Sequence, residues 1–238
     1  MPPLEEGGSP VGVDGLLAPL ALGFLLGVRH ATDADHVVAV SAIVARERSL
    51  RAASAIGAMW GVGHTATILG VGGAIILFGV VIPPRIGLGM EFAVALMLIA
   101  IGAINLGGTR TTDRAHASDG HAHGAQARAR FAVRPLVIGV VHGLAGSAAI
   151  ALLVLTTLHD ARAALAYLVL FGVGTVAGMI GLTTMMAVPL VATTRSRALH
   201  ASLARLTGAL SIGLGLFLAW RIGIADGLFS TTPHWTPE

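Results

Sequence analysis

Long apolar runs separated by short polar stretches recur along the whole chain. Six of them are long enough to cross a membrane as a helix, which takes about 20 residues. Their predicted bounds are Leu16–Ala45, Ala52–Ile82, Ile86–Leu106, Pro135–Leu158, Ala163–Ala192 and Leu203–Ile224. The pattern predicts an all-α, polytopic membrane protein with six transmembrane helices. Several runs exceed the length that a straight helix needs, so we expect some helices to be tilted, bent or broken.

The composition agrees with a membrane protein and excludes other classes. Hydrophobic residues make up 55% of the 238 positions and charged residues 11%, whereas a soluble domain has about 25% charged residues. The isoelectric point near 10.9 does not indicate a nucleic-acid partner, because the basic residues are all arginines and most lie in predicted loops. The lipid bilayer is the expected partner. The chain has no cysteine, which excludes disulfides and thiolate metal sites.

The arginines predict how the chain is oriented in the membrane. Eleven of the fifteen follow the first, third and fifth predicted spans, and three lie on the opposite side. Since cytoplasmic loops carry the excess of arginine, we predict a multi-pass protein of the cytoplasmic (inner) membrane with both termini extracytoplasmic.

This orientation divides the chain into five segments. They are an extracytoplasmic tail (1–15), a first three-helix unit (16–106), a cytoplasmic linker (107–134), a second three-helix unit (135–224) and an extracytoplasmic tail (225–238). The linker contains His116, His121 and His123. These histidines either capture metal weakly or are incidental in a solvated segment.

Two short motifs recur at nearly equal offsets along the sequence. Gly27-Val28-Arg29-His30 returns as Gly139-Val140-Val141-His142, and Gly61-Val62-Gly63-His64 returns as Gly172-Val173-Gly174-Thr175. A unit with an odd number of spans must turn over when it is repeated in tandem. The motifs therefore predict a 3+3 inverted repeat, a common build of secondary transporters.

One polar stretch interrupts the first apolar run, with the sequence Arg29-His30-Ala31-Thr32-Asp33-Ala34-Asp35-His36. Charge inside a membrane span is costly and usually marks a site or a pathway. On an ideal helix, at about 100° per residue, His30, Asp33 and His36 form one arc while Asp35 points away. Either Asp35 contacts another span, or the first helix is broken or kinked here, as in transporter ion sites.

The polar residues have the ligand chemistry of a divalent first-row metal, since imidazole and carboxylate suit Ni²⁺, Co²⁺, Cu²⁺ and Zn²⁺. We favour Ni²⁺ or Co²⁺ as the transported ion, although the usual affinity order does not exclude copper or zinc. The candidate ligands are His30, Asp33, Asp35, His36, His64 and His142. Arg29 is expected to be a charge partner of Asp33 or Asp35. His64 and His142 have an alternative role as hydrogen-bond donors between helices.

The stretch from Arg29 to Val37 resembles the RHAxDADHI signature of the nickel/cobalt transporter (NiCoT) family. Within it, His30, Asp35 and His36 match the family's HX4DH pattern, and Gly63-His64-Thr65 resembles the GHS/T segment of the next span. The family usually has eight spans and acidic segments in its second half, which this chain lacks. Its layout resembles a divergent six-span branch that includes urease-accessory nickel-transport proteins. The resemblance implies a permease that binds Ni²⁺ or Co²⁺ through His30, Asp33, Asp35, His36 and His64, without an organic cofactor.

We therefore predict a permease and not an enzyme, because the chain has no HExxH motif and no nucleotide-binding motif. Uptake is the favoured direction, since a membrane potential that is negative inside draws a divalent cation inward. Efflux is one alternative, because histidines in a cytoplasmic loop suit capture before export. The other is an accessory subunit that binds metal without transporting it. A cytoplasmic metallochaperone is a further candidate partner.

Overall fold

The computed structural model of the protein describes residues 13–45, 47, 49–107, 133–146, 160–192 and 197–235. Every regular element in these ranges is helical, as the apolar runs predict. In chain order the elements are α1 (Val13–His30), α2 (Ala34–Val44), α3 (Leu50–Phe78), α4 (Pro84–Gly107), the helix Val133–Gly146, α6 (Ala161–Ala192), α7 (Arg197–Trp220) and the short π-helix η2 (Arg221–Ala225).

Four helices are long and apolar enough to cross a membrane. They are Leu50–Phe78, Pro84–Gly107, Ala161–Ala192 and Ala198–Ala225, the last running through α7 and η2. The prediction of a polytopic, all-α protein is confirmed at this level, but the described residues do not form six continuous spans. The first predicted span, Leu16–Ala45, is two short helices, and the fourth, Pro135–Leu158, is described only as far as residue 146.

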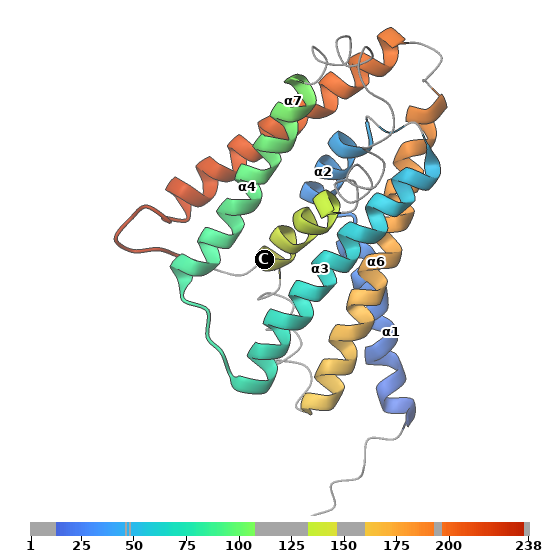
Figure 1. Ribbon diagram of the computed structural model, residues 1–238. Helices are drawn as coiled ribbons and strands as arrows, with labels where there is room; N and C mark the ends of the chain where they lie inside the picture. Colours follow the sequence, from blue (N-terminus) through green and yellow to red (C-terminus); the bar gives the residue numbers. More distant parts are fainter. Residues whose placement is uncertain are drawn as a thin grey trace, which may run out of the picture.

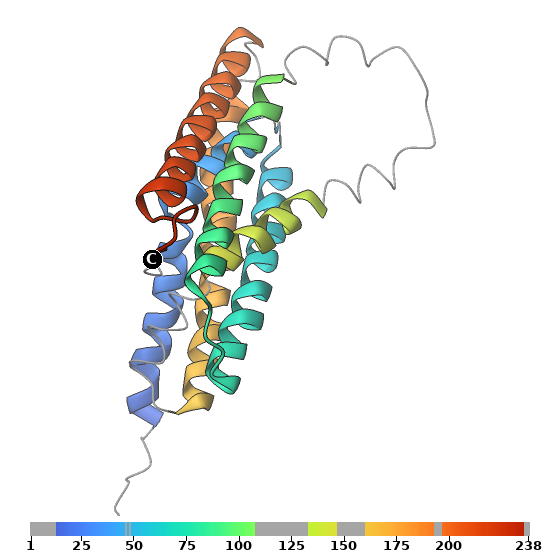
Figure 2. The same ribbon diagram turned by 90° about the vertical axis from the view of Figure 1, so that its left-hand side faces the viewer.

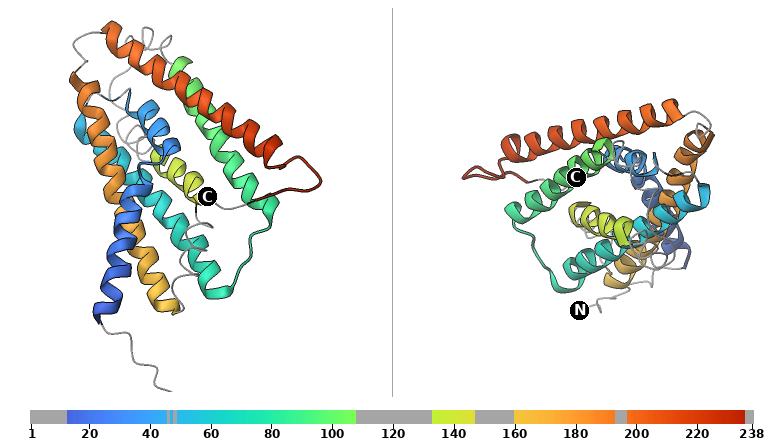
Figure 3. Two further views of the ribbon diagram at one scale, coloured as in Figure 1. Left: turned by 180° about the vertical axis from the view of Figure 1, so that it is seen from behind. Right: turned by 45° about the horizontal axis from the view of Figure 1, so that its top comes forward.

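Two groups of long helices enclose two short ones. On one side α3 and α1 both pack along α6, and on the other α4 pairs with α7 (Figure 1). The short helices α2 and Val133–Gly146 lie between these groups (Figures 2 and 3). Of these, α2 contacts α4, α6 and α7. Most of the predicted histidine-containing linker, 107–134, lies outside the described residues.

Glycines allow α1 and α6 to approach closely. A Cβ atom added to Gly27 of α1 would overlap the carbonyl oxygen of Phe171, and one added to Gly174 of α6 would overlap that of Phe24. Small residues at helix crossings are a general device of membrane proteins, where packing replaces the hydrophobic effect between helices. Here only glycine fits, because the obstacle is the backbone of the other helix.

The helix Val133–Gly146 meets α3 in the same manner. A Cβ atom on Gly139 would overlap the carbonyl oxygen of Trp60, and one on Gly63 would overlap that of Leu136. Gly143 lies against the backbone of His64, whose carbonyl oxygen would be 2.6 Å from an added Cβ atom. These approaches bring the short helix within side-chain reach of the polar residues on α3.

We predict that Gly27→Ala destabilises the protein by about 1–3 kcal/mol, because the added methyl group must push two helix backbones apart. Thermal unfolding of the detergent-solubilised protein, followed by tryptophan fluorescence, measures the effect. The matched control is Gly70→Ala on the exposed face of α3, where an added Cβ atom meets nothing within 4 Å. Equal melting temperatures for the two variants would contradict this account of the crossing.

Candidate metal site

The first predicted span is broken between α1 and α2. The peptide N–H groups of Thr32 and Asp33 donate to the carbonyl oxygens of Arg29 and His30 at 2.8 and 3.1 Å, which ends α1 in a tight turn. The Thr32 hydroxyl adds a second bond to the Arg29 oxygen at 2.6 Å. The chain then turns extended at Asp33, with φ −62° and ψ 150°, and α2 begins at Ala34. The predicted break in this helix is confirmed.

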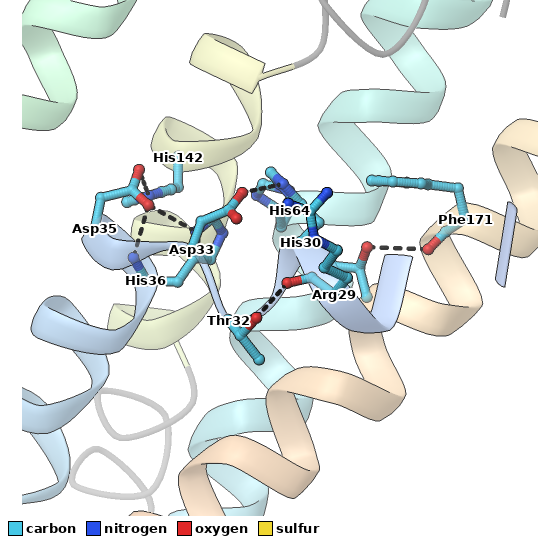
Figure 4. A network of polar contacts seen from close by, with 10 residues as sticks. Arg29, His30, Thr32, Asp33, Asp35, His36, His64, His142 and Phe171 are labelled. Carbon is cyan, nitrogen blue, oxygen red and sulfur yellow. Dashed lines mark hydrogen bonds and ion pairs between the residues drawn. The ribbon is translucent and has the colours of Figure 1, made fainter. Parts of the chain in front are cut away.

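The break brings together histidines from four helices, seen from close by in Figure 4. His30 at the end of α1 and His36 at the start of α2 have ring centroids 4.8 Å apart. His30 Nε2 lies 3.0 Å from Nε2 of His64 on α3. His142, from the helix Val133–Gly146, has its ring centroid 4.3 Å from that of His36. These four residues are the histidine cluster.

The two aspartates hold three of the four rings of the histidine cluster. Asp33 Oδ2 lies 2.8 Å from His30 Nδ1, and its side chain forms no capping bond to α2. Asp35 Oδ1 accepts from the backbone N–H of His36 at 2.8 Å and lies 3.1 Å from His36 Nδ1, while its Oδ2 lies 2.8 Å from His142 Nε2. Carboxylates that bind one nitrogen of a metal-ligating histidine fix its tautomer and direction.

These contacts determine which imidazole nitrogens are left for a ligand. An ionised carboxylate only accepts hydrogen bonds, so the nitrogen facing it carries the proton and the other nitrogen of a neutral ring has a lone pair. His36 Nε2, His64 Nδ1 and His142 Nδ1 are all buried and have no hydrogen-bond partner among the described residues. Buried polar atoms without partners are costly and rare. Three of them in one cluster indicate a site built for a ligand.

The histidine cluster offers two overlapping sets of metal ligands. One set is His30, His36 and His64, the other is Asp35, His36 and His142, and within each set the ligand atoms lie within 4.8 Å of one another. Bonds of about 2.1 Å to one ion would place the atoms at most about 4.2 Å apart. Three tetrahedral ligands at this bond length lie about 3.4 Å apart, so side-chain shifts of up to about an ångström would close either set around an ion.

The structure brings all six predicted ligands together, but it gives Arg29 a different place. The carboxylates of Asp33 and Asp35 contact histidines, and Arg29 is exposed on α1. Within the described ranges, no ion pair joins Arg29 to either aspartate. The predicted role of Arg29 as their charge partner therefore has no contact to support it.

Two aromatic residues that are not among the predicted site residues pack against the histidine cluster. Trp60 of α3 is fully buried, with its ring stacked at 6.0 Å on His36 and 5.6 Å from His142. The ring of Phe171 on α6 lies 5.5 Å from His30. Each of the two aromatic residues directly precedes one copy of the second repeated motif, which begins at Gly61 and again at Gly172. The two aromatic residues therefore occupy the same position in the repeat, and this is the feature of the sequence that could have related them to each other.

A cavity of about 300 Å³ connects the histidine cluster to the region where α4 begins and α7 ends. Its walls include His30, Asp33, Asp35, His36 and His142 at one end. Glu91 of α4 and Arg221 of η2 also line it. The cluster is thus buried in the protein yet faces a cavity, the setting in which irregular backbone is tolerated at membrane depth.

Comparison with known proteins gives one similarity over most of the chain. The sequence is 37% identical over 218 residues to the urease accessory protein UreH of Bacillus sp. (strain TB-90), which covers 90% of this chain and 96% of that protein. No protein-family model matches the sequence, and no solved structure gives a significant match.

We predict that the purified protein binds Co²⁺ and that His36→Ala abolishes this binding, since His36 belongs to both ligand sets. The absorption spectrum of Co²⁺ measures it, because nitrogen ligation produces visible bands. His234→Ala is the control, as this histidine is exposed and outside the cluster. Retention of the bands in His36→Ala would contradict the assignment.

The variant Asp33→Ala tests whether Asp33 orients the ring of His30. Since Asp33 contacts His30 Nδ1, its loss should weaken Co²⁺ affinity by about 10–100-fold without changing the number of ions bound. Isothermal titration calorimetry gives both quantities. An unchanged affinity would show that Asp33 does not orient the ring.

Proposed function

The chain belongs to the family of the urease accessory protein UreH, and on that premise we propose that it is a membrane permease for Ni²⁺ or Co²⁺. The observation that carries the proposal is the buried histidine cluster with its three unpartnered ring nitrogens. The NiCoT-like signature of Arg29–Val37 also supports it, since its residues His30, Asp35 and His36 belong to the two ligand sets. We propose transport and not catalysis.

The ligand chemistry favours these two ions. Imidazole nitrogens with supporting carboxylates suit Ni²⁺ and Co²⁺, whereas Cu⁺ prefers the thiolates that this chain lacks. Each proposed ligand also belongs to a hydrogen bond that an ion would replace or extend. Between His30 and His64, for instance, the N–H···N contact of 3.0 Å would be given up when the lone pair of His30 Nε2 binds the ion. Such exchangeable ligands permit the ion to leave as well as to bind.

We propose that the ion moves between the two ligand sets by exchanging ligands around His36. The ring centroid of His36 lies 4.8 to 5.2 Å from those of His30 and His64, and 4.3 Å from that of His142. An ion held by His36 can therefore release one pair of partners as it acquires the other. His36 would stay bound throughout, so the ion is never without a protein ligand.

The described contacts also support the proposed inverted repeat of two three-helix units. Gly27 of the first unit meets the backbone of Phe171, and its counterpart Gly139 meets that of Trp60, which is the counterpart of Phe171. Gly63 against Leu136 and Gly174 against Phe24 form a second pair of contacts with the same correspondence.

The aromatic contacts follow the same relation. His30 lies 5.5 Å from Phe171, and His142, its counterpart in the repeat, lies 5.6 Å from Trp60. The first helix of each unit thus packs on the second helix of the other. We propose a six-span, 3+3 arrangement with the metal site where the units meet, which is where such transporters hold their substrates.

We propose uptake across the cytoplasmic membrane, with both termini extracytoplasmic as the arginine distribution predicts. Moving a charge through 100 mV contributes about 2.3 kcal/mol, so a divalent ion gains about 4.6 kcal/mol. This is enough to concentrate the ion roughly 2,000-fold without another energy source. A cytoplasmic metallochaperone that receives the ion is a candidate partner.

Reconstituted vesicles test the proposed function. We expect ⁶³Ni²⁺ uptake that rises when a potassium diffusion potential makes the interior negative and that His36→Ala abolishes. His234→Ala should transport at the wild-type rate. Uptake only against an imposed positive interior would indicate efflux. Metal binding without any transport would indicate an accessory subunit and would reject the permease.

A further inference from the structure

The last described residues, 226–235, form a strap that returns from η2 to the beginning of α4 (Figure 3). The side chain of Arg85, near the start of α4, donates through Nη2 to the carbonyl oxygen of Ser230 at 3.2 Å. Within the strap, the backbone N–H of His234 donates to the carbonyl oxygen of Asp226 at 3.0 Å. The strap therefore has a defined course across this end of the α4–α7 pair.

The strap ends in a side chain that docks on α4. The indole ring of Trp235 fills the space beside Gly87, where an added Cβ atom would overlap it. One helical turn further along α4, Glu91 Oε1 accepts a hydrogen bond from Trp235 Nε1 at 2.7 Å. Gly87 and Glu91 lie on the same face of α4, because residues four apart are neighbours on a helix. Gly87 thus leaves space for the indole ring, and the carboxylate of Glu91 accepts the hydrogen bond from its N–H group.

Glu91 lies on the passage to the histidine cluster. Its side chain lines the same cavity as His36 and His142, at the end where α4 begins. Arg221 lines this end too, and its Nε lies 3.7 Å from Asp226 Oδ2 in the strap. The strap therefore contacts both charged residues there. Asp226 offsets the positive charge that would repel a cation, and Trp235 fixes the direction of the carboxylate that would attract one.

We propose that Glu91 is the ligand at which a divalent cation is first captured on its way to the histidine cluster, and that Trp235 positions it. The inference rests on the proposed permease function and assigns a second, outer binding position to the same passage. A carboxylate has about four lone-pair sites, so a carboxylate that accepts hydrogen bonds can also bind an ion. Carboxylate oxygen is also a more exchangeable ligand for these ions than a set of imidazoles, as capture and release require.

Capture by Glu91 should affect how fast ions arrive and not how tightly the cluster holds them. Charge that lines a narrow passage raises association rates by about 10–1,000-fold. For Glu91→Gln we expect a KM for Ni²⁺ uptake about ten times that of the wild type, with a maximal rate within a factor of two. Co²⁺ affinity of the histidine cluster should remain within a factor of two, and Glu91→Asp should restore most of the KM.

Asp160→Asn is the matched control. Asp160 lies at the start of α6 and is not part of the cavity wall, and its carboxylate accepts from the backbone N–H of Ala163 at 3.0 Å. Asparagine caps a helix about as well as aspartate, so this variant removes a charge and keeps the fold. We expect its KM to equal that of the wild type.

Trp235→Phe separates positioning from binding. The phenylalanine ring can still fill the space beside Gly87, but it cannot donate a hydrogen bond to Glu91. We expect a KM about three times the wild-type value, and no further increase when Trp235→Phe is added to Glu91→Gln, because the two residues act through one contact.

The outcomes distinguish this inference from the proposed function. If the wild type transports neither Ni²⁺ nor Co²⁺, the permease and the capture ligand are both rejected. If the wild type transports and Glu91→Gln keeps its KM, only the capture role is rejected. A Glu91→Gln variant that loses Co²⁺ binding at the cluster would also reject it, because Glu91 would then act on the inner site itself.

Discussion

A helix that stops in apolar surroundings exposes backbone groups that water cannot satisfy, and this constraint governs the arrangement around the break between α1 and α2. Several of the groups freed at the break have a partner close by. The Arg29 oxygen accepts from both the backbone and the hydroxyl of Thr32, and the first-turn N–H of His36 is bound by Asp35. Irregular backbone survives at membrane depth only when it is buried in protein or faces a polar cavity. The polar side chains of this stretch thus permit the break as well as furnish the site.

The glycine crossings set the distances within the site. Gly63 directly precedes His64, and Gly139 lies one helical turn before His142, so each of these two candidate ligands lies next to a point of close backbone approach. A bulkier residue at either crossing would push the helices apart and so widen the distances between the candidate ligands. Packing that is usually regarded as structural is here part of the binding geometry.

Sequence patterns predicted much of this arrangement, and the reasons differ from residue to residue. The apolar runs predicted an all-α membrane protein, and the angular position of Asp35 on an ideal helix indicated the break. The resemblance to the GHS/T segment identified His64, and the repeat identified His142. The roles of the aspartates were beyond such reasoning, because the direction of a side chain after a break depends on how the chain restarts. The positions calculated on an ideal helix apply only as far as His30, where α1 ends.

Contacts between distant residues were equally inaccessible. Trp235 and Glu91 are 144 residues apart, and no periodicity relates them. The sequence around Trp60 indicates only an interfacial or packing residue until its neighbours are known. Arg29 shows the opposite error: adjacency in sequence suggested a charge pair, whereas the turn after His30 directs the aspartates to histidines instead.

His36 belongs to both candidate ligand sets, and this limits how ions could cross the membrane through the proposed permease. With its Nδ1 next to Asp35, a neutral His36 has one lone pair and can bind one ion. The two sets therefore exclude simultaneous occupancy. Channels that conduct rapidly rely on repulsion between ions at adjacent filled sites to expel the leading one. Two positions that share one ligand nitrogen cannot generate that repulsion. In the proposed permease each ion would therefore dissociate by its own ligand exchange before the next arrives, and the transport rate would be that of a carrier.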